Sequence, residues 1–199
     1  MASNNYAIQV DTTHEYVGMI PQNSIAVMGY VTGSADIDWT PADWNHFPLA
    51  GKIRVDQSAS LLEFEAGRAD VGDVENGAGT MTAFLAAAAE RKKHSLDSTL
   101  YVSYDNLADA KAQITRAGLS GWVNYYVANW NWSMDQAEAF LATQGTAVAV
   151  QFASPSSNPR TILPGAKITL AVANCDLSVK RSGWFPAPGI ACSAWAESV

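Results

Sequence analysis

Apolar segments of strand length alternate with segments of helical spacing along most of the chain. Residues 24–32 and 147–152 are apolar on both faces, which is typical of strands in a parallel sheet covered by helices. The clearest helical segment is 81–93, where Thr80 is placed to cap the first turn and the basic residues 91–93 suit the dipole of the last turn. This alternation predicts right-handed crossovers and a parallel sheet.

The number of strands and the shortness of some helices favour a barrel. The expected strands cover residues 24–32, 52–56, 69–75, 99–104, 122–128, 147–152 and 168–173. About seven or eight strands, with several helices short or missing, predict a compact, irregular, TIM-like (β/α) barrel rather than an open doubly wound sheet. No glycine-rich phosphate loop follows the first of these strands, which weighs against a dinucleotide-binding fold.

A chain of 199 residues lies within the range of one domain, so we expect a single α/β domain. The barrel is expected over 24–182. Residues 1–23 are polar and mixed and are expected to form an extension before it, in which 6–10 is a candidate short strand. Residues 183–199 contain several turn-forming residues and are expected to lie across the barrel surface.

Two acidic residues near the end of one expected strand indicate a chemical function. Asp73 and Glu75 lie two apart in an apolar segment that ends at Asn76-Gly77. In an extended strand both side chains share a face, with their Cα atoms about 7 Å apart. One carboxyl group held protonated beside one held ionised is suited to cleavage of a glycosidic bond. The alternative is a solvated strand end that carries two surface acids.

Functional groups of a (β/α) barrel lie at the C-terminal ends of its strands. The polar residues expected there are Asp56, Asp73, Glu75, Ser103, Tyr104, Gln151 and Asp176. Acids at several separate strand ends predict a real site. Burial between apolar neighbours is expected to raise the pKa of Glu75, as a general acid requires.

Three of these residues have alternative explanations that stay open. Asp56 would form a structural ion pair with Arg54 or Arg68, Gln151 would satisfy buried backbone groups, and Asp176 would cap a turn.

The composition excludes several functions. With 48% hydrophobic and 16% charged residues the chain can build a core, and its net charge of −7 argues against a nucleic-acid partner. Residues 1–22 contain no basic region followed by an apolar one, so we expect no signal peptide, and no apolar run reaches the roughly 18 residues of a membrane helix. We therefore expect a soluble protein, made in the cytoplasm and released by another system if it acts outside the cell.

Two cysteines and three scattered histidines predict neither a metal site nor a cofactor. Either Cys175 and Cys192 form a disulfide or both are free thiols, and free thiols fit a chain without a signal peptide better.

Several segments together resemble the family-25 glycoside hydrolases, the muramidase-type lysozymes, and most closely their divergent branch in actinobacteria and phages. The matching segments are residues 29–31 with 38–39, 70–77, 100–103, 126–130, 148–153 and 176–179. The resemblance implies hydrolysis of the β-1,4 bond after N-acetylmuramic acid in peptidoglycan. It implies that Glu75 is the general acid, that Asp73 stabilises positive charge on an oxocarbenium ion or on an intermediate formed by the substrate's N-acetyl group, and that Asp176 assists. The residues expected to line the sugar cleft are Tyr30, Tyr104, Trp130 and Gln151.

The chain departs from this family at its first strand. Family members carry an aspartate at the C-terminal end of that strand, whereas residues 24–32 contain no acid. Asp36, Asp38 or Asp56 are the candidate substitutes, and Asp56 is kept among the expected catalytic residues. The alternative function is a non-catalytic barrel that binds cell-wall glycan or forms part of a phage particle, docked through its termini.

Overall fold

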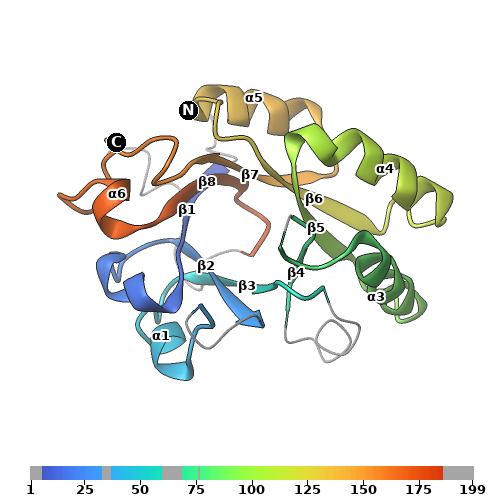
Figure 1. Cartoon of the computed structure of the whole chain (residues 1–199), viewed down its shortest axis with the longest axis horizontal. Coiled ribbons are helices and arrows are strands. Elements are labelled where there is room, and N and C mark those ends of the chain that lie inside the picture. Colours follow the sequence, from blue (N-terminus) through green and yellow to red (C-terminus); the bar gives the residue numbers. More distant parts are fainter. Residues whose placement is uncertain (1–5, 33–36, 60–68, 76, 186–199) are drawn as a thin grey trace.

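Eight strands form a closed barrel in the part of the chain that the computed structural model describes, residues 6–32, 37–59, 69–75 and 77–185 (Figure 1). The strands follow one another around the barrel in sequence order, and β8 closes on β1. Their bounds are β1 Tyr6–Asp11, β2 Ala26–Thr32, β3 Gly51–Asp56, β4 Val71–Asp73, β5 Ser98–Ser103, β6 Val123–Ala128, β7 Ala147–Ala153 and β8 Asp176–Arg181. The protein is therefore a single-domain α/β barrel.

The sheet is parallel from β1 to β7, and β8 runs antiparallel to both of its neighbours. The expectation of an all-parallel sheet is thus wrong for the last strand. After β7 the chain passes through a loop and the short helix α6 (Leu170–Ala173) and re-enters the sheet from the rim at which β7 ends. The start of β8 consequently lies beside the C-terminal ends of the other strands.

Two segments at the ends of the barrel differ from the sequence-based expectation. Residues 168–173 were expected to form the last strand, but they contain α6, because a short apolar run does not distinguish a strand from a helical turn. Residues 6–11 were expected within an extension over 1–23, but they form β1 of the barrel. The inward side chains Gln9 and Asp11 are polar, so β1 lacks the apolar pattern of a buried strand.

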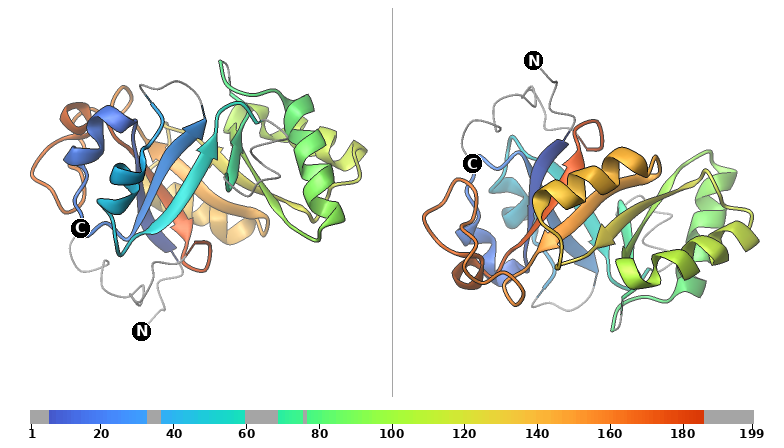
Figure 2. Two further views of the ribbon diagram at one scale, coloured as in Figure 1. Left: turned by 90° about the horizontal axis from the view of Figure 1, so that it is seen from below. Right: turned by 90° about the horizontal axis from the view of Figure 1, so that it is seen from above.

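Three helices of ten or more residues lie outside the barrel: α3 (Met81–Lys93), α4 (Leu107–Arg116) and α5 (Met134–Thr143) (Figures 1 and 2). The predicted bounds and the Thr80 cap of α3 are confirmed, since the Thr80 hydroxyl accepts a hydrogen bond from the Ala83 N–H. Ser133 and Gln136 form a capping box that starts α5.

The remaining helical segments that the structure describes are short. They are the 3₁₀ helices η1 (His14–Met19) and η2 (Tyr104–Asn106), α1 (Pro41–Asn45) and α6. Because β1–β2, β2–β3 and β7–β8 are joined through such short segments, the helices within the described residues do not form a regular ring around the barrel.

Apolar side chains pack in two layers, one between the barrel and its helices and one inside the barrel. The inner layer includes Ile53, Val71 and Tyr126 and is closed at one end by Trp184, whose ring contacts that of Tyr126. The buried ammonium group of Lys180 donates hydrogen bonds to the carbonyl oxygens of Arg181 and Trp184. The first residues of the expected tail over 183–199 therefore close one end of the barrel. Residues 186–199 of this tail lie outside the described part.

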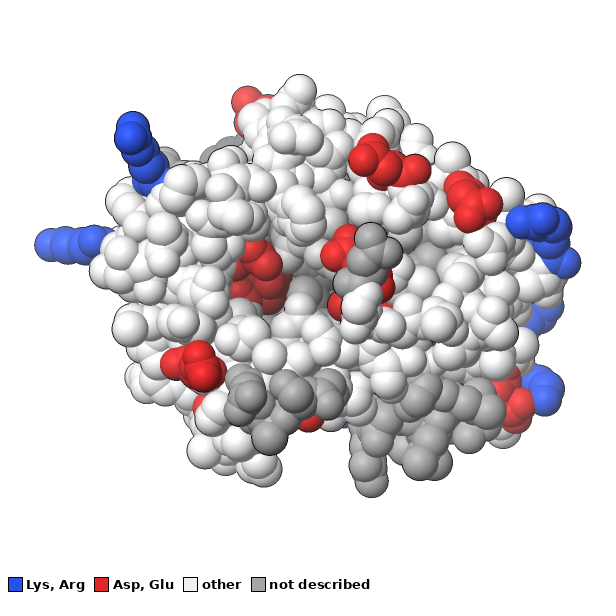
Figure 3. All heavy atoms as spheres, in the orientation of Figure 1, with Lys and Arg blue, Asp and Glu red and all other residues white. Residues whose placement is uncertain are grey.

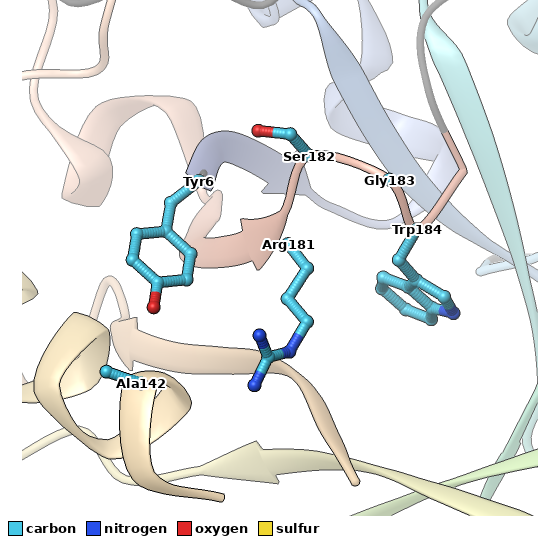
Figure 4. A pocket seen from close by; sticks show the side chains of 6 residues that line it. All are labelled: Tyr6, Ala142, Arg181, Ser182, Gly183 and Trp184. Atoms are coloured by element: carbon cyan, nitrogen blue, oxygen red, sulfur yellow. The ribbon is translucent and has the colours of Figure 1, made fainter. Parts of the chain in front are cut away.

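A pocket of about 640 Å³ opens at the end of the barrel that Trp184 closes, where β1 begins and β8 ends (Figure 4). Its lining includes Tyr6, Arg181 and Trp184. The Arg181 guanidinium donates to the carbonyl oxygens of Ala147 and Leu141, which ties β8 to the end of α5. The pocket therefore lies at the opposite end of the barrel from the C-terminal ends of β1 to β7.

None of the helices within the described residues has the length and apolar character needed to cross a membrane.

Candidate active site

Three strands bring four carboxyl groups to one rim of the barrel. Asp11 ends β1, Asp73 ends β4, and Glu75 follows two residues later. Asp176 starts β8 and reaches the same rim because β8 is antiparallel. We call these four residues the acid cluster. In Figure 3, Asp and Glu atoms flank a hollow near the centre of the molecular face, whereas Lys and Arg atoms lie at its edges.

Asp11 and Asp176 form a buried carboxyl pair. The side-chain amide nitrogen of Gln151 lies 3.3 Å from both carboxyl oxygens of Asp11 and 3.1 Å from Oδ2 of Asp176. Burial raises the pKa of both groups, and the charge of Asp11 raises the pKa of Asp176 further. Two adjacent buried carboxylates repel each other, so the pair favours a state in which one proton is shared between the two groups.

Gln151 connects this pair to the aromatic residues of the rim. It is only 2% exposed, and its Oε1 accepts hydrogen bonds from the Tyr101 hydroxyl and, at 3.0 Å, from the Trp130 indole N–H. An indole nitrogen can only donate, so Oε1 must face Trp130 and the amide nitrogen must face the carboxyl pair. Gln151 therefore holds the acids and Trp130 in place and has no polar atom left for a sugar, which corrects its expected place in the cleft lining.

Asp73 and Glu75 are the two acids of the cluster that come from one segment, separated by Val74. β4 ends at Asp73, and the Glu75 backbone N–H donates to Asp73 Oδ1 at 3.0 Å, so the strand does not extend through Glu75 as expected. Burial raises the pKa of Asp73 to about 6. The hydrogen bond from Glu75 acts to lower this pKa, and the charge of Asp56 acts to raise it. Burial raises the pKa of Glu75 to about 7, and the charges of Asp73 and Asp176 add to the rise. Near neutral pH, Glu75 thus keeps a proton more readily than Asp73.

Tyrosine hydroxyls line the cluster from inside the barrel. Burial raises the pKa of Tyr30, and the charges of all four acids raise it further. Burial likewise raises the pKa of Tyr101 and of Tyr126. These phenols stay neutral, and the hydroxyls of Tyr101 and Tyr126 are already hydrogen-bonded within the barrel, to Gln151 and to Gln9 with Ser178. Tyr30 therefore lies in the site as expected, and Tyr101 and Tyr126 are additions to it.

Asp56 ends β3 and is hydrogen-bonded to the loop that follows this strand. It is fully buried and accepts hydrogen bonds from the Thr32 hydroxyl and from the backbone N–H and hydroxyl of Ser58, at 2.9 and 2.7 Å for Ser58. These hydrogen bonds give Asp56 a structural role, and its expected catalytic role stays a prediction. The alternative pairing with Arg54 is wrong, because the Arg54 guanidinium forms a two-point contact with Asp70. Arg68 and Asp36 lie outside the described residues.

Two of the expected sugar-binding aromatics are exposed at the rim. Trp130 is 39% exposed beside Gln151, and Tyr104 is 43% exposed directly after β5. The Tyr104 ring contacts Trp132 and Phe140. Tyr104 is thus placed beside the acid cluster rather than in it.

Asp11 is the acid of the candidate site that sequence reasoning missed. The sequence contains a signal for Asp11, because residues 6–11 end in an acid, as residues 51–56 do, and both segments precede a loop. The polar Gln9 within the segment concealed it, since Gln9 faces inward to donate a 2.7 Å hydrogen bond to the Tyr126 hydroxyl.

Fold and site together define an α/β barrel with paired carboxyl groups at the C-terminal rim of its parallel strands. Comparison with known proteins finds no match to this chain among family models, curated proteins or solved structures. Within the described residues, no three His, Cys, Asp or Glu side chains are arranged to hold a metal ion. Cys175 is buried and Cys192 lies outside the described residues.

Proposed function

We propose that the protein is a glycoside hydrolase that degrades peptidoglycan, of the muramidase type, with Glu75 as its general acid. The observation that carries the proposal is the neighbouring pair Asp73 and Glu75, in which burial raises the pKa of Glu75 to about 7 and that of Asp73 to about 6. A pair of carboxyl groups whose environments separate their pKa values has the properties needed for glycosidic cleavage.

In this mechanism Glu75 donates its proton to the glycosidic oxygen while the bond from that oxygen to the anomeric carbon breaks. The ionised Asp73 stabilises the positive charge that develops, either on an oxocarbenium ion or on a ring formed by the substrate's own N-acetyl group. Water then adds to the anomeric carbon and returns a proton to Glu75. The neutral hydroxyl of Tyr30 is placed to donate a hydrogen bond to the sugar.

Asp11 supports the resemblance to the family-25 glycoside hydrolases. That family carries an aspartate at the end of the first strand, and Asp11 ends β1 of this barrel. The main reason for preferring a non-catalytic barrel, a missing first-strand acid, is therefore removed. We further propose that the barrel is an irregular member of the TIM-like (β/α) class, with few helices and a reversed β8.

The charges around the cluster favour an uncharged glycan. The charged groups that act on the pKa values of Tyr30, Asp73 and Glu75 are all carboxylates. A site of this kind repels anionic substituents and stabilises positive charge. We therefore take peptidoglycan sugars with amide-linked peptides, or a related neutral polysaccharide, as the substrate.

Turbidity of a suspension of Gram-positive cell walls tests the proposal. The wild-type protein is expected to lower the turbidity and to release fragments with N-acetylmuramic acid at the new reducing ends, whereas Glu75→Gln is expected to do neither. The matched control Glu15→Gln changes an exposed glutamate of η1 and should behave as wild type. Binding to the walls by wild type without any lysis would instead favour the wall-binding barrel.

A further inference from the structure

Thr12 directly follows Asp11 and connects the end of β1 to the segment that leads into β8. It is only 5% exposed, and its hydroxyl donates a 2.7 Å hydrogen bond to the carbonyl oxygen of Asn174. Asn174 lies two residues before Asp176, where α6 ends. This bond therefore links the two members of the carboxyl pair through their near neighbours in sequence, in addition to the backbone pairing of β1 and β8.

Asn174 forms the turn from which β8 starts. Its φ and ψ are both 47°, in the left-handed region that asparagine tolerates better than most residues other than glycine. The Thr12 hydroxyl holds the carbonyl group of this turn. The direction in which the chain enters β8 is therefore fixed by a side chain at the end of β1.

Trp39 holds Thr12 from the other side. The Trp39 indole N–H donates a 2.8 Å hydrogen bond to the carbonyl oxygen of Thr12, and the tryptophan is only 5% exposed. The backbone N–H of Trp39 donates to the carbonyl oxygen of Tyr30 at 2.9 Å. Its ring covers Gly29 of β2 so closely that an added Cβ atom would overlap it. Thr12 is thus held between β2 and the start of β8.

The carboxyl pair depends on this close placement. The amide nitrogen of Gln151 reaches both carboxyl groups, at 3.3 Å for Asp11 and 3.1 Å for Asp176. Within the described residues, Oδ1 of Asp176 is buried and has no hydrogen-bond partner. If the start of β8 moved away from β1, water would reach this oxygen and the two groups would ionise more easily.

We propose that Thr12 is a positioning residue for the acid cluster. Its bond to the segment before β8 keeps Asp11 and Asp176 close enough to share a proton. Burial raises the pKa of Glu75, the proposed acid, and the charges of Asp73 and Asp176 add to the rise. The placement of Asp176 therefore bears on glycan cleavage, and this last step rests on the proposed function.

The other titratable groups that face the pair or its neighbours belong to several elements. They are Tyr30, Asp73, Glu75, Tyr101, Tyr126 and Cys175. Burial raises the pKa of each tyrosine and of Cys175, so these groups stay neutral below about pH 10. A titration between about pH 3 and pH 10 therefore reports the four carboxyl groups of the acid cluster.

The test follows the carboxyl carbon signals of the pair by NMR during such a titration, with Asp11→Asn and Asp176→Asn used for assignment. Thr12→Val replaces the hydroxyl by a methyl group and should lower the higher pKa of the pair by about one pH unit or more. Thr12→Ser keeps the hydroxyl and should keep the wild-type pKa. Thr143→Val is the matched control, because it also removes a hydroxyl that donates to a backbone carbonyl, that of Phe140 in α5.

Thr12→Ala gives a second measurement of the same link. It leaves space rather than a methyl group beside the Asn174 carbonyl and should lower the same pKa. A pair that titrates as in wild type in both Thr12→Val and Thr12→Ala, or that shifts equally in Thr143→Val, would overturn the positioning role, even if the melting temperature fell.

The turbidity assay judges the proposed function separately. Thr12→Val should lower the rate of wall lysis about tenfold, and Thr12→Ser should not, since a small misplacement of catalytic groups is costly. A shifted pair in a protein that lyses no cell wall would retain the role of Thr12 and reject the glycosidase. Lysis by wild type, with an unshifted pair in the Thr12 variants, would retain the glycosidase and reject the role of Thr12.

Discussion

Asp11 and Asp176 lie directly opposite each other in the antiparallel pairing of β1 and β8. The pairing brings two carboxyl groups from opposite ends of the described chain into one buried pair at the rim. The side-chain amide of Gln151 is shared between them. This arrangement exists only because β8 is reversed, since a parallel strand would place Asp176 at the other end of the barrel.

The carboxyl pair should make the protein less stable as the pH rises. Burial raises the pKa of Asp176 in the folded state above its value in the unfolded chain. Its contribution to stability is therefore fully present below the unfolded pKa and is lost as the pH rises through the folded pKa. Asp176→Asn removes this loss. We expect its melting temperature at about pH 9 to exceed that of wild type by roughly 2–4 °C, equivalent to about 1 kcal/mol.

The comparison is made by thermal unfolding at about pH 4 and at about pH 9, since the effect should disappear at the lower pH. Asp97→Asn, at an exposed position, serves as the control. If Asp176→Asn were no more stable than wild type at about pH 9, ionisation of the carboxyl pair would not destabilise the folded protein.

The rate of glycan cleavage should depend on pH as a bell. Cleavage needs Asp73 ionised and Glu75 protonated, and burial raises their pKa values to about 6 and about 7. Initial rates of turbidity loss should therefore be highest between these two values and fall on both sides. Glu75→Gln should lower kcat by about 10²–10⁴-fold at the optimum. A rate that continues to rise well above pH 7 would contradict the role of Glu75 as the acid.

Gln151→Glu tests how Gln151 holds the site. The new carboxylate can still accept from Tyr101 and Trp130, but when ionised it cannot donate to the carboxyl pair and adds a third charge to it. We expect a loss of about 1–3 kcal/mol in the free energy of unfolding at about pH 8, with partial recovery near pH 5, where the new group takes up a proton. Denaturant unfolding measures both values.

Gln136→Glu is the matched control for this change, because a glutamate at that position preserves the capping box of α5. If Gln151→Glu lost stability equally at both pH values, the effect would come from packing rather than from charge.

Asp56→Ala should separate a structural acid from the catalytic ones. The substitution removes the carboxylate that accepts hydrogen bonds from the Thr32 and Ser58 hydroxyls, which should cost about 1–3 kcal/mol in the free energy of unfolding. The rate of wall lysis per folded molecule should stay within about threefold of wild type, whereas Asp73→Ala should reduce it by about 10²-fold or more. A hundredfold loss of lysis in Asp56→Ala with unchanged stability would restore Asp56 to the catalytic residues.

Much of the architecture follows from local sequence patterns. The bounds of α3, with its cap Thr80, were predicted to the residue. The apolar strand around Val150 was predicted nearly to its ends. Such elements follow from spacing and capping chemistry that a few neighbouring residues supply, and their alternation indicates an α/β barrel. The pair Asp73 and Glu75 was identifiable for the same reason, because both acids lie within one segment.

The tertiary structure alone decided which other residues complete the site. Gln9 and Asp11 are polar side chains that point into a barrel, and their burial is favourable only because their hydrogen-bond partners come from distant strands. The reversal of β8 is likewise a property of how the sheet closes. A local pattern cannot reveal these features, because the free energy that stabilises each of them depends on contacts made across the barrel.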